Sequence, residues 1–399
     1  MEVRLETMRK MNPVVFVICI VTIMTVNWMA CDMFLPAQPQ IVEYFNTDAA
    51  TLNLALSVYF VGSAVSVLVG GPLSDKFGRK PMLLLGVLMF TLFGFGCTFA
   101  PSVWFLIVCR GGASLGGGFM SAVTMAMVKD YLDIDLFQKA MAIIQSVIVL
   151  GPVVAPFLGS FMLMIGNWRW TLGAIAFLGV ICVIITLCLP ETLPKERRVN
   201  GGMLPAMKGL VEVGKDRNFS ILLLIISFMC MPFFAFIAVC SYICMDFFGM
   251  TYIQYSVFYA GICLVSFTAP FVYLWLDKRF PSRNILMACF ILLVTTTLGL
   301  VLFGKISPIV LLLVFLPYTY AEGISRPLGM VLLLNQHDDT SGAASALTSF
   351  ATSIIGTLGT VVATLHWGNY LDGLFWCFTG CLVLALSLWG LLIKLKVKL

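Results

Sequence analysis

Four ionisable residues lie inside long apolar stretches of the sequence: Asp32, Arg110, Glu322 and Arg326. A charge within a membrane span costs about 2.5–3.5 kcal/mol on insertion scales, so such residues are candidates for function. A helix rises about 1.5 Å per residue, which places Asp32 and Arg110 at comparable depth below one membrane face. If both face one cavity, the charge of Arg110 favours an ionised Asp32 while burial favours the neutral acid, and a shifting balance would suit a proton carrier. A purely structural buried ion pair is the alternative.

Glu322 and Arg326 are four residues apart, which places them on one face of a helix. They could neutralise each other as a structural pair, or they could take part in handling substrate or protons. The sequence leaves both interpretations open.

Other chemistries find little support in the residue types. The two His and the thirteen Cys, which all fall in apolar runs, show no metal-ligand spacing, so neither a metal nor another cofactor is expected. Gly116, Gly117 and Gly118 lie in an apolar run with no Lys-Ser/Thr after them, which indicates helix packing rather than a phosphate loop. The sequence has no paired His and no Ser beside a base, so an enzyme is not predicted.

The composition shows which elements must hold these residues. Of 399 residues, 60% are hydrophobic and only 11% are charged, which indicates an all-α integral membrane protein in a lipid bilayer. No polar block is large enough for a nucleic-acid module. Apolar runs long enough to cross the membrane stand at 13–35, 49–72, 81–100, 103–128, 139–164, 168–190, 219–245, 253–276, 284–304, 307–330, 341–365 and 370–393.

The long polar stretch 191–218 divides these twelve spans into six plus six. We therefore predict an N-terminal half over 1–190, a cytoplasmic linker over 191–218 and a C-terminal half over 219–399. Positive residues favour the cytoplasmic side, and most Lys and Arg residues fall on one side of the predicted spans, whereas only Arg169 and Lys305 fall on the other. Both termini are thus predicted to be cytoplasmic, in a bacterial inner membrane, and the protein is expected to be a monomer.

The turn after the second run reads GPLSDKFGRKP from Gly71 to Pro81, and it resembles the loop 2–3 signature of the major facilitator superfamily. Glycine permits a tight turn, Asp75 can sit at the positive N-terminus of a neighbouring helix, and the basic residues can pair with acids such as Asp130. The resemblance implies that this turn gates transport through Gly71, Asp75, Gly78 and Arg79.

Three further motifs narrow the resemblance. The segment Asp32–Pro36 reads DMFLP and is similar to the DMYLPALP pattern of the bicyclomycin and chloramphenicol resistance branch of drug/proton antiporters. Arg110 opens a stretch that resembles the fourth-helix motif of the superfamily, although Ala113 stands where Gln is usual. The fifth run resembles the antiporter motif, with Gly151, Pro152, Pro156 and Gly159 in place.

The resemblance implies the major facilitator fold and a proton-coupled exporter of small amphiphilic drugs, phenicol-type antibiotics among them. Export of an endogenous metabolite or siderophore on the same scaffold is the alternative, and a membrane sensor or membrane-embedded enzyme is the rival from another class. Asp32 and Arg110 would couple protons to transport. The expected substrate cavity comprises Asn27, Asp32, Tyr59, Gln145, Phe236, Tyr320, Glu322 and Arg326.

Overall fold

The computed structural model describes residues 11–198, 210–334, 336, 341–365 and 367–394, except for the side chains of 135, 142, 145–150 and 341–343. In this part of the chain all regular structure is helical, and eleven helices are long and apolar enough to cross a membrane. A twelfth long helix, α7 (Ile134–Ile165), contains the apolar stretch Gly151–Ile165. The prediction of an all-α protein with twelve membrane spans is therefore confirmed.

The chain divides into two compact units. The first unit comprises Met1–Gln40 and Val58–Pro205, and the second comprises Ile41–Ser57 and Ala206–Leu399. The long helix α4 (Ala49–Phe77) contributes its first residues to the second unit and the remainder to the first.

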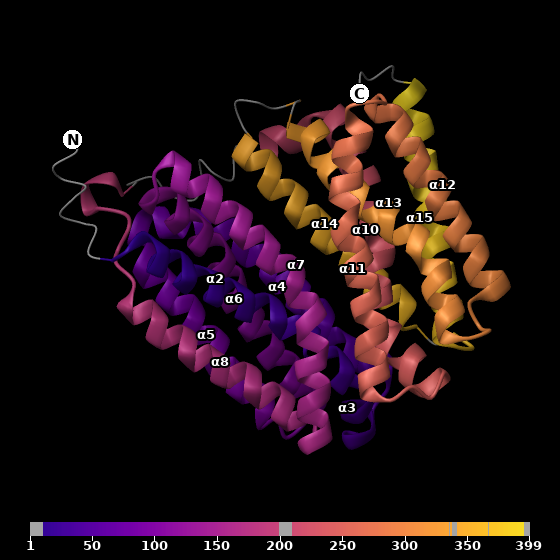
Figure 1. Ribbon diagram of the computed structural model, residues 1–399, viewed down its shortest axis with the longest axis horizontal. Coiled ribbons are helices and arrows are strands. Elements are labelled where there is room, and N and C mark those ends of the chain that lie inside the picture. Colours follow the sequence, from indigo (N-terminus) through magenta and orange to yellow (C-terminus); the bar gives the residue numbers. More distant parts are fainter. Residues whose placement is uncertain (1–10, 199–209, 335, 337–340, 366, 395–399) are drawn as a thin grey trace. The chain divides into compact units, whose positions relative to one another are not determined.

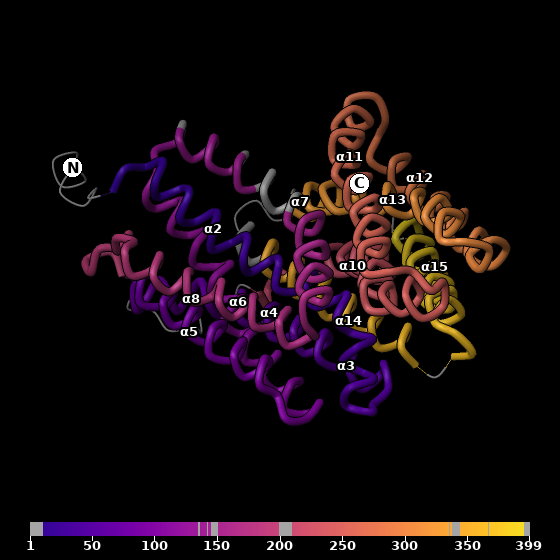
Figure 2. The backbone as a smooth tube through the Cα atoms, turned by 60° about the horizontal axis from the view of Figure 1, so that its bottom comes forward, coloured from indigo at the N-terminus to yellow at the C-terminus, as the bar shows by residue number. Residues whose placement is uncertain are grey.

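The first unit is a bundle in which several helices begin at side-chain caps. Asn12 caps α2 (Pro13–Asp32), Ser102 caps α6 (Val103–Tyr131), and Asn167 caps α8 (Trp168–Cys188), each accepting a hydrogen bond from a backbone N–H of the first turn. A short 3₁₀ helix, η1 (Leu35–Ala37), follows α2. The helix α5 (Arg79–Thr98) packs along both α6 and α8, as Figures 1 and 2 show.

Glycines allow the close packing of α5 against α6. A Cβ on Gly116 would lie 2.5 Å from the backbone nitrogen of Phe90, and one on Gly86 would lie 3.0 Å from the Gly116 carbonyl oxygen. Larger residues at these positions would push the helices apart. The glycine run beginning at Gly116 therefore serves helix packing, as its sequence context indicated.

The second unit is built around α10 (Arg217–Tyr242), which packs against three other helices of that unit and continues into the π-helical turn η3 (Ile243–Phe247). An aromatic cluster joins these helices, with the Phe236 and Phe315 ring centroids 4.0 Å apart. The remaining helices are α11 (Tyr252–Asp277), α12 (Ser282–Phe303), α13 (Pro308–Leu334), α14 (Ser341–Ala363) and α15 (Tyr370–Lys394).

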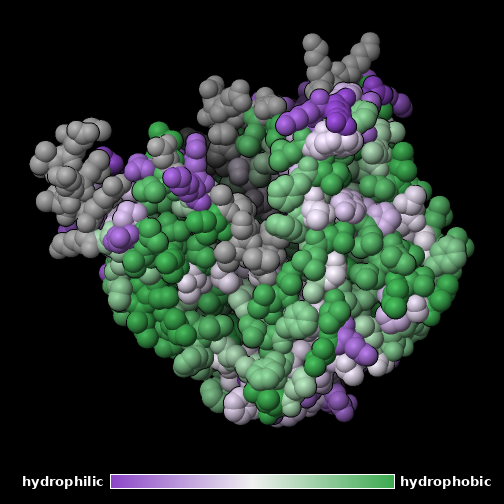
Figure 3. Space-filling model, viewed as in Figure 1, coloured by the Kyte–Doolittle hydropathy of each residue, from purple (hydrophilic) through white to green (hydrophobic). Residues whose placement is uncertain are grey.

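Hydrophobic side chains cover much of the surface in view, and hydrophilic ones gather near helix ends (Figure 3). Leu92 is 68% exposed and Val108 is 67% exposed, although both lie well inside long helices. Such exposure would be costly in water, whereas the acyl chains of a bilayer are an apolar solvent for these side chains.

Candidate functional site

Arg110 is buried in the first unit, where α6 meets α2 and α4. Its Nη1 donates a hydrogen bond to the Ala30 carbonyl at 3.2 Å. The guanidinium lies over two rings, with Cζ 4.4 Å from the centroid of Phe34 and 4.3 Å from that of Tyr59. Within the described part of the chain, Nε and Nη2 have no hydrogen-bond partner. A charge held in this way can attract an anionic or strongly polar group.

Asp32 is buried at the end of α2, close in sequence to the groups that hold Arg110. Phe34 follows Asp32 by two positions and lies just beyond the last residue of α2. The contacts described for Arg110 are with Ala30, Phe34 and Tyr59. The structure thus places the two predicted proton-coupling residues in one unit, both near the C-terminal end of α2.

The predicted antiporter motif lies on α7 and supports this end of α2. A Cβ on Gly159 would lie 2.6 Å from the Met33 carbonyl oxygen, so glycine is what lets α7 approach the chain directly after Asp32. Pro152 and Pro156 lie inside α7 and remove two backbone donors from it, whereas Gly151 has open space beside it. Gln145 belongs to α7, but its side chain lies outside the described residues.

Asn27 and Tyr59 place polar groups beside Arg110. The Asn27 amide nitrogen donates to Ser121 Oγ on α6 at 2.8 Å, and the Tyr59 hydroxyl donates to the Asn27 carbonyl at 3.3 Å. A Cβ on Gly117 would collide with Asn27 Oδ1, so the glycine leaves room for the amide. The same amide oxygen is buried without a hydrogen-bond partner in the described residues, which leaves it as an acceptor.

Arg79 organises the predicted gating turn. Its Nη2 lies 2.6 Å from Asp75 Oδ1 and its Nε lies 2.8 Å from Asp130 Oδ2, while Nη1 donates to Ser74 Oγ at 2.6 Å. Pairing between the basic turn and Asp130 was suggested by the sequence. Gly78 connects α4 to α5 with a φ of +104°, which favours glycine. A Cβ on Gly71 would have no neighbouring atom within 4 Å, and the carbonyl of this glycine accepts a hydrogen bond from Ser74.

Glu191 is a site residue whose role the sequence did not reveal. Its Oε1 accepts hydrogen bonds from the backbone N–H groups of Arg79 at 2.9 Å and of Leu193 at 3.1 Å, and its Oε2 lies 3.3 Å from Arg198 Nη2. The carboxylate at the positive end of α5 is therefore Glu191, whereas Asp75 pairs with Arg79. The motif Pro190–Leu193 was visible in the sequence, but its capping role depends on the tertiary fold.

In the second unit, Glu322 and Arg326 form an ion pair one helical turn apart on α13. Glu322 is buried, whereas the Arg326 side chain is 49% exposed. The Arg326 guanidinium also lies over the Phe233 ring, with Cζ 5.6 Å from the centroid. The pairing that the sequence left open is therefore present, and the exposed part of Arg326 can still meet another group.

The other two cavity candidates of this unit lie elsewhere. Phe236 is fully buried against Phe315, in the aromatic core of the unit. Tyr320 accepts a hydrogen bond from Thr268 Oγ1 at 3.0 Å and lines an apolar groove with Pro317 and other residues of α11, α12 and α13. Tyr320 precedes Glu322 by two residues and so points to another side of α13.

A polar cluster that was not expected from the sequence joins α4 to α14 within the second unit. Asn53 Nδ2 donates to the Thr360 carbonyl at 2.8 Å and to Thr364 Oγ1 at 3.1 Å. Ser57 Oγ lies 2.9 Å from Thr360 Oγ1. All four residues are buried. An Asn inside the apolar run 49–72 was the available signal, because polar residues in spans commonly join neighbouring helices.

No group of three or more His, Cys, Asp or Glu that could hold a metal ion occurs among the residues that the structure describes. Among these residues, Arg79 and Arg326 pair with carboxylates, and Arg110 donates a hydrogen bond to a backbone carbonyl.

Comparison with known proteins gives the family. A model described as Major Facilitator Superfamily matches residues 20–360. The multidrug resistance protein MdtL of Shewanella oneidensis is 26% identical over 256 residues, which cover 64% of this chain and 64% of that protein. This chain therefore spans slightly less than two thirds of that relative. An uncharacterized MFS-type transporter of Bacillus subtilis, YdgK, is 24% identical over 82% of this chain and 83% of its own length.

Solved transporters share the fold. The nucleoside transporter NupG superposes with a TM-score of 0.76 at 15% identity, over 96% of this chain and 99% of that one. The xylose transporter XylE from E. coli, in a partially occluded inward-open conformation, gives a TM-score of 0.69 at 15% identity, over 94% and 97%. The human organic anion transporter MFSD10 gives 0.65 at 19% identity, over 96% and 100%.

Proposed function

The chain belongs to the Major Facilitator Superfamily, and from that premise we propose that it is a proton-coupled exporter of small amphiphilic drugs, phenicol-type antibiotics among them. It works by alternating access in a bacterial inner membrane, with both termini in the cytoplasm. Members of this family move small molecules across a lipid bilayer, and the MdtL relatives are named for multidrug resistance.

The observation that carries the proposal is the environment of Arg110. Its buried guanidinium is held by the Phe34 and Tyr59 rings and keeps two N–H positions available within the described residues. Asp32, a buried carboxylate, ends the helix whose Ala30 carbonyl Arg110 contacts. A carboxylate and a fixed positive charge in one buried region can exchange protonation for ligand binding as water enters and leaves.

Each unit offers its own candidate groups for substrate recognition. Asn27 offers a buried amide oxygen, and Tyr59 offers an aromatic face. Glu322 and Arg326 compensate each other in charge, which suits a neutral or weakly charged drug better than a permanent cation. Gating depends on Arg79 and the acids around it, here called the Arg79 cluster. This cluster connects the turn between α4 and α5 to Asp130 and Glu191.

The test expresses the full chain in cells that lack their own drug exporters and measures chloramphenicol susceptibility and accumulation, with and without an uncoupler of the proton gradient. We expect reduced accumulation that the uncoupler abolishes. Asp32→Asn should be inserted at the wild-type level yet lose proton-driven efflux, because the amide cannot titrate. Glu196→Gln, the same chemical change at an exposed carboxylate, is the matched control. Full coupled efflux by Asp32→Asn would overturn the assignment.

A further inference from the structure

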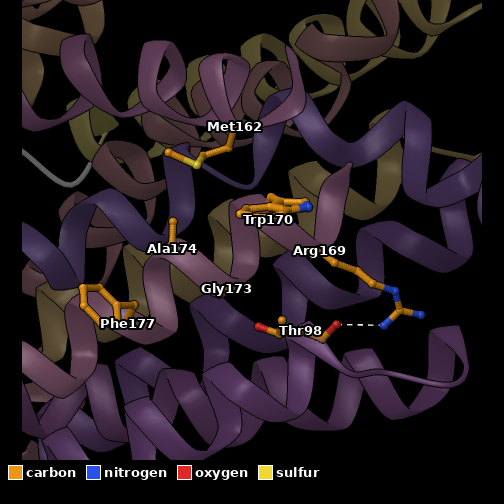
Figure 4. A pocket seen from close by; sticks show the side chains of 7 residues that line it. All are labelled: Thr98, Met162, Arg169, Trp170, Gly173, Ala174 and Phe177. Atoms are coloured by element: carbon orange, nitrogen blue, oxygen red, sulfur yellow. Dashed lines mark hydrogen bonds between the residues drawn. The ribbon is translucent and has the colours of Figure 1, made fainter. Parts of the chain in front are cut away.

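An apolar groove runs along the membrane-facing side of α8 in the first unit. Its volume is about 460 Å³, within the range of small-molecule sites. The walls come from α5, α7 and α8 and include Met162, Trp170 and Phe177 (Figure 4). Trp170 is 58% exposed and Phe177 is 63% exposed, so the groove opens onto the surface that a bilayer would cover. It lies apart from the residues of the proposed transport site.

The groove has a charged end and an apolar end. Arg169 and Phe177 lie at opposite ends of the labelled residues in Figure 4, with Gly173 and Ala174 between them. Eight residues of helix separate Arg169 from Phe177, a rise of about 12 Å. One leaflet of the hydrocarbon core is about 15 Å thick. The small residues Gly173 and Ala174 leave the space that larger side chains would fill.

Arg169 is held in place at the charged end. Its Nη1 donates to the Thr98 carbonyl at 2.8 Å and its Nη2 donates to the Ala100 carbonyl at 3.1 Å. Its Cζ lies 4.3 Å from the ring centroid of the buried Trp168. A guanidinium remains protonated in proteins, so Arg169 carries a positive charge at this end of the groove. Arg169 follows the first residue of α8, so its charge stands where this helix enters the membrane.

We propose that this groove binds one glycerophospholipid, with the headgroup phosphate on Arg169 and an acyl chain along Gly173, Ala174 and Phe177. Three features select this ligand: a fixed cation at a membrane face, an apolar channel nearly one leaflet long, and an opening toward the bilayer. Arginine is suited to phosphate oxygens by charge and geometry. The lipid would bridge α5, α7 and α8 and so stabilise the packing of these helices.

A second groove provides an internal comparison. It lies between α11, α12 and α13 in the second unit, has a volume of about 480 Å³, and is lined by residues such as Leu276, Leu313 and Tyr320. Among the described residues that line it, none is charged. It can accept an acyl chain, but it offers no group that would select a phosphate. Phosphate recognition is therefore the property that distinguishes the Arg169 groove.

The experiment titrates the purified full chain in detergent with phosphatidylglycerol and, separately, with diacylglycerol that carries the same acyl chains but no phosphate. Native mass spectrometry counts the bound lipids. We expect one phosphatidylglycerol to bind more tightly than any further copies. Arg169→Gln should weaken this first binding about tenfold, as expected for the loss of a charged hydrogen bond, and leave diacylglycerol binding unchanged. Gly173→Leu should weaken both, because its side chain enters the groove.

Two matched controls test whether these effects are local. Arg279→Gln removes an arginine that lies over Trp275, with Cζ 4.1 Å from the ring centroid, in the second unit. Gly380→Leu adds the same bulk at an exposed position of α15 with open space beside it. Both should bind lipid as the wild type does. Wild-type phosphatidylglycerol binding by Gly173→Leu, or equal losses in the controls, would overturn the proposal. This comparison decides the question even if Arg169→Gln does not fold.

Discussion

The guanidinium carbon of Arg110 lies 4.3 Å from the ring centroid of Tyr59, and the hydroxyl of the same tyrosine donates to the Asn27 carbonyl at 3.3 Å. One side chain therefore positions both the embedded charge and the neighbouring helix. A cation over a ring in a desolvated site contributes about 2 kcal/mol. The long hydrogen bond of the hydroxyl contributes about 1 kcal/mol or less.

This difference gives the first prediction. Tyr59→Phe keeps the ring and should lower the thermal stability of the detergent-solubilised protein only slightly. Tyr59→Leu removes the ring and should lower it more, with a larger loss of efflux. Arg110→Lys should also lose efflux, because an ammonium cannot stack flat between the two rings. Equal stability and efflux for Tyr59→Phe and Tyr59→Leu would show that the ring does not hold the charge.

The second prediction concerns the gating turn. Asp75→Asn and Asp130→Asn each remove one carboxylate from Arg79, and such partly exposed pairs contribute about 1 kcal/mol or less to stability. Turnover of bound substrate should nevertheless fall while ligand affinity changes little. Asp372→Asn is the control, since it removes an exposed ion pair, Lys305 with Asp372 at 2.9 Å, outside the turn. If affinity fell and turnover did not, the gating role would be wrong.

The third prediction concerns substrate charge. The wild type should export a neutral phenicol at least as well as a quaternary cation of similar size, because Glu322 is already paired with Arg326. Arg326→Gln leaves the buried carboxylate without that partner, so the ratio of cation to neutral efflux should rise. The double variant Glu322→Gln with Arg326→Gln should return the ratio toward the wild-type value. A strong wild-type preference for the cation would show that the pair does not set specificity.

The fourth prediction uses the polar cluster of α4 and α14. Thr360 Oγ1 donates its proton to the Thr357 carbonyl at 2.8 Å, so in its contact with Ser57 it must accept. Thr360→Val therefore leaves the Ser57 hydroxyl without an acceptor, and it should cost about 1–3 kcal/mol in unfolding free energy. Ser57→Ala should cost less, and the double variant should be no less stable than Thr360→Val alone. Chemical unfolding of the purified variants measures all three, and strict additivity would contradict the assigned direction.

The helices could be located from the sequence because the length and hydropathy of a span are local properties. The expected run 103–128 corresponds to α6, Val103–Tyr131. The hydropathy pattern predicted some spans to end before the helix does, because the helix continues with polar residues. The run expected to end at 72 continues through Asp75 to Phe77, because its last turn forms the Arg79 cluster.

The site could be predicted less completely. Motif spacing suggested that the basic turn pairs with Asp130, and the structure shows Arg79 in that pair. The orientation of Asp32 relative to Arg110 could not be predicted from the sequence. The helix α2 is apolar on all sides, so its sequence does not reveal which face meets α6. The cap that Glu191 places on α5 joins residues more than a hundred positions apart. Such contacts depend on how the bundle closes, which local patterns do not determine.

The connection between α4 and α5 consists of one residue, Gly78, between helices that end at Phe77 and begin at Arg79. A single inserted residue would turn α5 by about 100° and shift it by about 1.5 Å. That rotation would carry Arg79 away from Asp130 and the whole glycine-bearing face of α5 away from α6. Chain length at this point is therefore constrained as strictly as residue identity. In a scan of single-residue insertions, the turn at Gly78 should tolerate none, whereas the exposed segment Lys195–Arg197 should accept them.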